Sequence, residues 1–380
     1  MSFSALALVV LIGLLGPVLS ARAAWRVPVV VGELLGGVLI GVTGFGLVDP
    51  TTDGFRLLAS IGFGLTMVVA GSHVPIRDRG VRGALLAGVI GAIAVGIVAA
   101  LIGTAIAVWF DTGHPALYAV ILASSSAALV LPMMPTSKAD QASLLRMVAQ
   151  IAVADVVCIV ALPLVIAPER ALWPAVGATA IAAVATLLSL LLRRHPVGER
   201  VRRRLHDYSE RRRFALELRL SLLVLFTFAA IAQFASLSIM LAGFALGLVL
   251  ASVGEPRRLA RQLFGLTEGF FGPLFFVWLG ASLDFRTVLA HPAMILLGVV
   301  LGTGAVLAHV LARVTGLPLR QALASAGQLG VPVAAVTLGL QSGVLAPGED
   351  GALILGAAIT IVVSAWAAGS LSRRPEARAP

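Results

Sequence analysis

Long runs of apolar residues recur along the 380-residue chain, separated by short polar stretches. A helix needs about 20 mostly apolar residues to cross the hydrocarbon core of a bilayer. By this measure the pattern predicts thirteen membrane-spanning helices, at residues 2–20, 28–47, 55–74, 83–109, 116–135, 144–166, 172–192, 214–234, 237–253, 267–284, 291–313, 319–341 and 351–371. We therefore expect an all-α polytopic membrane protein, a single membrane domain spanning residues 1–380 with no soluble domain.

The composition agrees with this pattern. Hydrophobic residues make up 59% of the chain, charged residues only 12%, and the mean hydropathy is +1.02. A soluble chain carries about 25% charged residues. The single cysteine, Cys158, lies in an apolar run and is expected to be a small core residue, since it has no partner for an internal disulfide.

Basic residues alternate between loops in a way that predicts orientation. Of 28 Lys and Arg residues, 24 lie in the loops after odd-numbered segments or in the C-terminal tail, Arg219 lies inside a segment, and only Arg56, Arg170 and Arg286 lie in the other loops. Cytoplasmic loops carry the excess of positive charge. We expect an inner (plasma) membrane protein with its N-terminus outside and its C-terminus in the cytoplasm. The first segment is retained as a helix because Arg22 and Arg26 follow it, the reverse of a cleavable signal.

The stretch 193–213 carries nine arginines and three acidic residues and accounts for much of the high pI of about 11.4. In the predicted topology it is the central cytoplasmic loop that links the two halves of the chain. Orientation and contact with anionic lipid head groups explain its charge. No nucleic-acid partner is expected.

Ionisable residues inside the membrane are costly and mark candidate functional sites. Most acidic residues fall in predicted loops, Glu349 and Asp350 among them, and Glu268 falls within about a turn of a helix end. Asp155 lies at the middle of the sixth segment, and no Lys or Arg lies deeper in that segment than Arg146. Desolvation favours the protonated carboxyl, and a cation that prefers oxygen ligands would compete with this proton. The alternative is a protonated, structural Asp155.

Two further polar residues lie within segments. Glu33 is about a turn and a half inside the second segment and is predicted to be structural, bonding backbone in the core, rather than an ion ligand. His309, inside the eleventh segment, is predicted to be packed rather than catalytic. The chain has no set of His, Asp and Ser residues at mid-depth, so no enzyme activity is expected.

Two segments carry small or polar residues at mid-membrane followed by a proline. The fifth contains Ser124, Ser125 and Ser126 and then Pro132, and the twelfth contains Gln328 between two glycines and then Pro332. Proline and glycine interrupt helices, and the freed carbonyls and hydroxyls can coordinate an ion where they line a cavity. The two segments are seven apart, an odd offset, as inverted-repeat transporters require. The alternative is two proline kinks without a role.

Four stretches resemble the monovalent cation:proton antiporter-2 family, the Kef-like branch of the sodium/proton exchanger superfamily. They are Pro28–Gly41 with Gly44–Leu47, Val153–Asp155, Phe271–Asp284 and Gly316–Ala322. The resemblance implies thirteen helices in inverted repeats, with helices five and twelve crossing at the ion site. It also implies a homodimer in which a core domain rocks against a dimerisation domain.

The chain departs from the family pattern at three places. The residue before the ion-site aspartate is usually Asp or Asn, but here it is Ala154, which has no side-chain oxygen. The lysine of helix eleven in electrogenic members is absent from Gly302–Ala305, and an acidic residue common in helix twelve is replaced around Val331. One titrating carboxylate remains, so we expect one cation to displace one proton in electroneutral exchange.

The leading hypothesis is a secondary active transporter that exchanges Na⁺ or K⁺ for protons by alternating access. Its ion would be bound by Asp155, Ser124, Ser125, Ser126 and Gln328, with no cofactor and no metal beyond the transported cation. Two alternatives stay open: an organic-anion transporter of related fold, and a degenerate sensor or subunit that does not transport.

Overall fold

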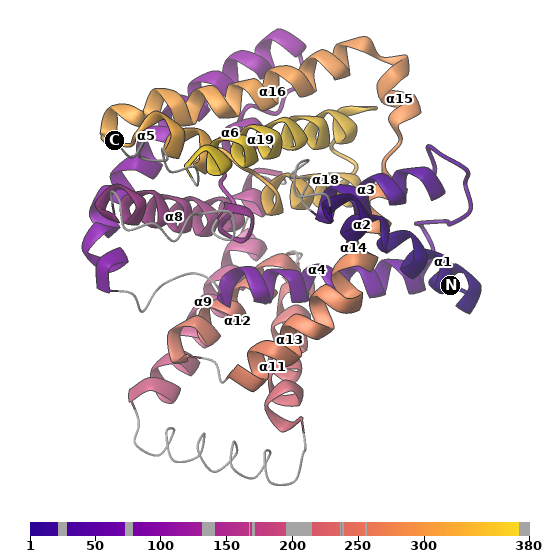
Figure 1. Ribbon diagram of the computed structural model, residues 1–380, viewed down its shortest axis with the longest axis horizontal. Coiled ribbons are helices and arrows are strands. Elements are labelled where there is room, and N and C mark those ends of the chain that lie inside the picture. Colours follow the sequence, from indigo (N-terminus) through magenta and orange to yellow (C-terminus); the bar gives the residue numbers. More distant parts are fainter. Residues whose placement is uncertain are drawn as a thin grey trace, which may run out of the picture. The chain divides into compact units, whose positions relative to one another are not determined.

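The computed structural model describes residues 1–21, 29–72, 79–130, 141–166, 168, 172–194, 215–235, 237, 239–254 and 257–371, and every regular element among them is helical (Figure 1). Helices satisfy their own backbone hydrogen bonds, as a segment in lipid must. The chain forms two compact units, one made of Met1–Ile76 with Glu169–Arg286 and the other of Arg77–Pro168 with Thr287–Pro380.

The first unit is held together by close contacts at glycines. Its elements are α1 (Phe3–Gly13), α2 (Leu15–Ser20), α3 (Val29–Ile40), α4 (Asp53–Ser72), α9 (Leu172–Arg194), α11 (Leu216–Phe234), α12 (Ile239–Val253), α13 (Arg257–Leu266), the π-helix η3 (Thr267–Phe271) and α14 (Gly272–Ser282). A Cβ on Gly280 of α14 would overlap the Leu34 carbonyl oxygen of α3, and one on Gly243 of α12 would overlap the Gly64 carbonyl oxygen of α4. Small residues allow membrane helices to approach this closely.

The second unit contains every predicted ion-site residue. Its elements are α5 (Arg79–Phe110), α6 (Pro115–Ala123), α7 (Ala127–Val130), α8 (Gln141–Ile166), α16 (Pro292–Leu311), the 3₁₀-helix η4 (Ala312–Thr315), α17 (Leu319–Ser325), α18 (Gly330–Ser342) and α19 (Glu349–Leu371); the short α15 (Phe285–Ala290) precedes α16. The order long helix, broken helix, long helix occurs twice: α5, α6/α7, α8 and α16, α17/α18, α19. Within this unit α16 lies beside α19 and α5 packs against α6 and α8 (Figure 1).

Each of the thirteen predicted segments contains helix in the structure, but the second, predicted at 28–47, is helical only to Ile40 and continues as turns that include Gly46 at positive φ. Ten helices are long and apolar enough to cross a membrane among the residues described. Two further segments correspond to the shorter apolar helices Val29–Ile40 and Ile239–Val253. The remaining segment, predicted at 116–135, is the interrupted pair α6 and α7. The all-helical membrane fold with two broken helices is thereby confirmed.

The sequence-based boundaries were wrong at the tenth segment. The region before residue 267 was expected to be a loop, but it forms α13, which continues through η3 into α14. Leu259 and Leu263, four residues apart, are buried on one face of α13, and this amphipathic spacing favours a helix over a loop. As a result Glu268 lies in the middle of a helical run, not near a helix end.

Two further predictions concern the ends of elements. Glu349 and Asp350 were placed in a loop, but they begin α19 and both are buried. Pro132 lies outside the described residues, as does the basic stretch 193–213 except for Arg193 and Arg194 at the end of α9.

Candidate functional site

The first broken helix is interrupted at three consecutive serines. Helix α6 ends at Ala123, Ser124 takes an extended conformation (φ −71°, ψ 150°), and helical structure resumes at Ala127. The Ser124 hydroxyl donates to the carbonyl oxygen of Ile121 at 2.8 Å. Serine side chains compete in this way for backbone partners, which favours the end of a helix over its interior.

The second broken helix is interrupted between Ser325 and Gly330. Helix α17 ends at Ser325, Leu329 has φ −141° and ψ −63°, and α18 begins at Gly330. Pro332 is the third residue of α18, within its first turn. A proline there loses no intrahelical bond, because the first N–H groups of a helix have no intrahelical acceptor. Pro332 therefore lies at the start of the second half-helix and does not kink it.

The two interruptions cross and bond to one another. The backbone N–H of Ser126 donates to the carbonyl oxygen of Gly327 at 2.9 Å. The Ser125 hydroxyl donates to the carbonyl oxygen of Ser325 at 2.8 Å. In the opposite direction, Nε2 of Gln328 donates to the Ile121 carbonyl oxygen at 2.7 Å and lies 3.3 Å from that of Ser124.

These bonds provide donors for carbonyl groups that the interruptions leave without intrahelical partners. The last carbonyls of a helix have no intrahelical donor, and an unsatisfied backbone group in an apolar interior costs several kcal/mol. Residues of each interruption supply donors to the C-terminal carbonyls of the other half-helix. Ser124, Ser125, Ser126 and Gln328 are all buried, so protein groups replace the water that would otherwise bind there. The crossing is a reciprocally capped pair of helix ends.

Two neighbouring helices complete this arrangement. Ser364 of α19 donates to the Ala324 carbonyl oxygen at 2.6 Å, and Oγ1 of Thr360 accepts from the backbone N–H of Gln328 at 3.2 Å. On α16, Nε2 of His309 lies 3.1 Å from the Ser125 hydroxyl, and its Nδ1 lies 2.9 Å from the Ala305 carbonyl oxygen.

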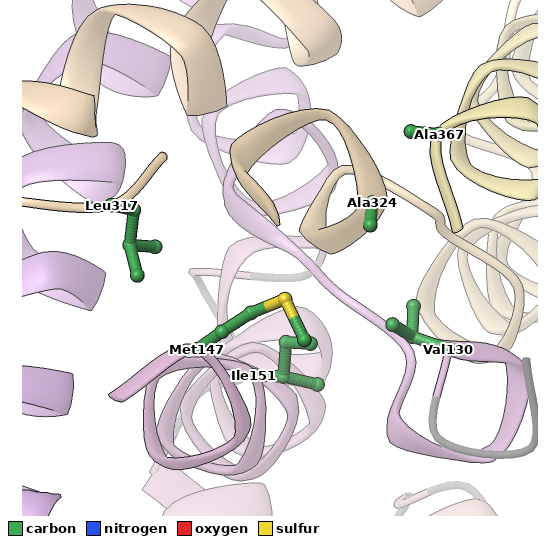
Figure 2. Close-up of a cluster of buried hydrophobic side chains, with 6 residues drawn as sticks. All are labelled: Val130, Met147, Ile151, Leu317, Ala324 and Ala367. Carbon is green, nitrogen blue, oxygen red and sulfur yellow. The ribbon is translucent and has the colours of Figure 1, made fainter. Parts of the chain in front are cut away.

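Asp155 is buried close to the middle of α8, and α8 packs against α6, α7, α17 and α18. Figure 2 shows Met147 and Ile151 of α8 beside Val130 of α7 and Ala324 of α17, in a cluster completed by Leu317 and Ala367. Residues four apart lie on one side of a helix. Asp155 follows Ile151 by four residues, so it continues the stripe of α8 that faces the crossing elements.

The structure thus brings together four predicted ligands and places the fifth on a helix packed against them. Ser124, Ser125, Ser126 and Gln328 form the crossing itself. Ala154 is buried next to Asp155 and adds no side-chain oxygen. Glu33 is buried on α3 in the first unit, so it is not among the residues of the crossing.

The buried contacts of several polar residues were not predicted from the sequence. His309, Thr360 and Ser364 contact the crossing, although each is a single polar residue in an apolar helix and its partners are distant in sequence. Glu349 was also missed: its Oε1 accepts from the Tyr118 hydroxyl at 2.7 Å and lies 2.9 Å from Nδ1 of His114, and its Oε2 accepts from the backbone N–H of Ala346. The sequence did contain a signal for this position: Glu349 and Asp350 follow Gly348, and an acidic pair is favourable at the start of a helix.

The crossing is rich in oxygen atoms. The N-terminal ends of α7 and α18 begin beside it with partial positive charge, and the C-terminal ends of α6 and α17 meet there with partial negative charge. Their carbonyls, three serine hydroxyls and the Asp155 carboxyl are oxygen atoms, the ligand type of hard cations. In the part of the chain that the structure describes, no three His, Cys, Asp or Glu residues are grouped to hold a metal ion.

Comparisons with known proteins agree with the membrane fold. The family model described as "Sodium/hydrogen exchanger, transmembrane" matches residues 6–373. The fold is similar to that of the sodium proton antiporter MjNhaP1 from Methanocaldococcus jannaschii, solved at pH 8, with a TM-score of 0.64 and 16% sequence identity over 97% of both chains. A comparison with curated proteins gave no match.

Proposed function

Because the chain belongs to the sodium/hydrogen exchanger family, we propose that it exchanges Na⁺ or K⁺ for protons by alternating access at the crossing of α6/α7 and α17/α18. The observation that carries this proposal is the reciprocal capping of the two broken helices. It gathers carbonyl and hydroxyl oxygens within one buried network, on elements against which the helix of Asp155 packs. Transporter sites of this kind use unwound backbone and helix C-termini as cation ligands.

In this proposal Asp155 is the group for which cation and proton compete. Its carboxylate supplies the one full negative charge among the proposed ligands, and a proton neutralises it when the cation leaves. The neutral ligands are the hydroxyls of Ser124, Ser125 and Ser126, the Oε1 atom of Gln328 and the unwound backbone. Nε2 of Gln328 is already engaged with α6, so its amide oxygen is the atom left to face an ion.

The proposed exchange is electroneutral. Ala154 supplies no second carboxylate, and Gly302–Ala305 supplies no lysine, so one cation replaces one proton at one acidic group. A site with these ligands changes its net charge little between the two loaded states. Either loaded state can then cross the membrane without work against the potential.

All proposed ligands belong to one compact unit, so a movement of that unit as a body would carry the whole site. We propose further that the protein lies in the inner membrane as a homodimer, with the N-terminus outside and the C-terminus in the cytoplasm. The distribution of 24 against 3 basic loop residues supports this orientation. Family resemblance supports the dimer.

Proteoliposomes containing a trapped pH dye test the proposal. Addition of Na⁺ or K⁺ outside is expected to drive protons out of the vesicles, and the cation with the lower KM is the substrate. Li⁺ provides a smaller ion for comparison. Folded protein that moves no protons with any of these cations would contradict the proposal and favour an organic-anion transporter or a non-transporting subunit. Uptake of a radiolabelled carboxylate would then separate those two.

A further inference from the structure

His309 is a buried histidine whose two ring nitrogens face the Ser125 hydroxyl of the crossing and the Ala305 carbonyl of its own helix. The residue is 2% exposed, Nδ1 lies 2.9 Å from the Ala305 carbonyl oxygen, and Nε2 lies 3.1 Å from the Ser125 hydroxyl. A carbonyl only accepts hydrogen bonds, so Nδ1 must carry a hydrogen. In the neutral ring, Nε2 is then an acceptor aimed at Ser125.

The Ser125 hydroxyl has a single hydrogen and lies within hydrogen-bond distance of two acceptors. Its Oγ lies 2.8 Å from the Ser325 carbonyl oxygen and 3.1 Å from Nε2 of His309. A hydroxyl has one hydrogen to donate and two lone pairs to offer. With neutral His309, the hydroxyl therefore bonds either the carbonyl of α17 or the imidazole of α16, and the two orientations exclude each other.

The choice between these orientations changes what the crossing offers a cation. When the hydroxyl donates to Ser325, the carbonyl at the end of α17 is occupied. When the hydroxyl turns to His309, this carbonyl is released, and the lone pairs of Ser125 are turned away from the imidazole. The ring holds the second orientation in place because its tautomer is fixed by Ala305.

We propose that His309 is a positioning residue for the transported cation: its Nε2 accepts the Ser125 hydroxyl hydrogen when the cation binds Ser125 Oγ and the Ser325 carbonyl oxygen. The hydrogen stays on Oγ throughout, and only its direction changes. This inference rests on the proposed exchange function. It gives α16 a role in cation affinity, although His309 itself does not touch the ion.

Cation KM and maximal rate in proteoliposomes test this role. His309→Leu removes the acceptor and is expected to raise KM about fivefold to tenfold, as loss of one hydrogen bond predicts, with a smaller change in maximal rate. His309→Gln keeps an acceptor at the position of Nε2 and is expected to stay within about twofold of wild type. Thr303→Val, on an exposed position of the same helix, is the control and is expected to leave KM unchanged.

A double variant separates positioning from structure. Because His309 acts through the Ser125 hydroxyl, Ser125→Ala combined with His309→Leu is expected to raise KM no further than Ser125→Ala alone. Effects that multiply in the double variant would overturn the proposal, and so would an unchanged KM in His309→Leu.

If His309→Leu does not fold, ¹⁵N NMR of the wild-type protein gives the second measurement. Saturating cation is expected to shift the Nε2 resonance of His309, identified by its absence in His309→Gln, and no shift overturns the proposal.

The outcomes distinguish this inference from the function on which it rests. Wild-type protein that moves no protons with any cation overturns both. Wild-type exchange that Asp155→Asn abolishes, together with an unchanged KM in His309→Leu, overturns only the role of His309.

Discussion

Nε2 of Gln328 lies 2.7 Å from the carbonyl oxygen of Ile121, so a residue of one broken helix caps the C-terminus of the other. The same amide nitrogen is 3.4 Å from the Leu122 carbonyl oxygen and 3.3 Å from that of Ser124. In the opposite direction, the Ser125 hydroxyl donates to the Ser325 carbonyl oxygen at the end of α17. Each interruption therefore donates to the carbonyls at the end of the other half-helix, and the oxygen atoms of both are held in one buried network.

Gln328→Leu should destabilise the protein. The substitution removes the Nε2 donor from the end of α6, but the Ile121 carbonyl keeps the Ser124 hydroxyl and N–H, so the expected cost is that of one hydrogen bond, about 0.5–1.5 kcal/mol in the free energy of unfolding. Thermal unfolding in detergent is expected to show a lower Tm. Gln341→Leu, at an exposed position of α18, the half-helix that follows Gln328, is the matched control and should leave Tm nearly unchanged. Equal Tm values for the two variants would contradict the capping role.

Tyr118→Phe tests the buried Glu349 network. The Tyr118 hydroxyl donates to Oε1 of Glu349, whose side chain has no exposed surface. Loss of this donor is expected to lower the free energy of unfolding by about 1–3 kcal/mol. His114→Ala should cost less, since the His114 side chain is 23% exposed and water can replace it. A larger loss of Tm in His114→Ala than in Tyr118→Phe would contradict this order.

Gly280→Ala tests the close contact between α3 and α14. An added Cβ would overlap the Leu34 carbonyl oxygen, and overpacking of this kind costs about 1–3 kcal/mol. Gly96→Ala, in the interior of α5, meets no atom within 4 Å and is expected to stabilise the helix by about 0.5–1 kcal/mol. Opposite shifts in Tm are predicted. A Gly280→Ala protein as stable as wild type would show that the two helices can separate freely at this point.

The fold could be predicted from the sequence further than the site. The apolar runs indicated thirteen segments. The prolines and the three consecutive serines centred on Ser125 indicated which two segments are broken. Both signals are local in the chain, so the sequence alone contains them. The partner of each break was not predictable, since the pairing of Gln328 with Ile121 depends on tertiary contact between residues 207 positions apart. For the same reason His309 was interpreted as merely packed. Glu349 was misplaced because the start of a helix is poorly marked when charged residues begin it, and Glu268 because the polar, basic sequence of α13 was taken for a loop.

Competition at one carboxylate predicts the pH and voltage dependence of transport. If a single proton excludes a single cation, the apparent KM for the cation should rise by at most roughly tenfold for each unit by which pH falls. Exchange rates in proteoliposomes should not change when a diffusion potential is imposed with a permeant anion. A steeper dependence on pH, or a current that accompanies transport, would contradict electroneutral exchange at one acidic group.

Asp155→Asn tests the central claim most directly. The amide keeps the size of the side chain but cannot titrate, so a cation and a proton can no longer alternate there. In proteoliposomes, cation-driven proton flux is expected to disappear in Asp155→Asn and to persist in wild type and in Asp111→Asn, a matched change at an exposed residue outside the described helices. Coupled proton flux that survives in folded Asp155→Asn protein would show that Asp155 is not the group for which cation and proton compete.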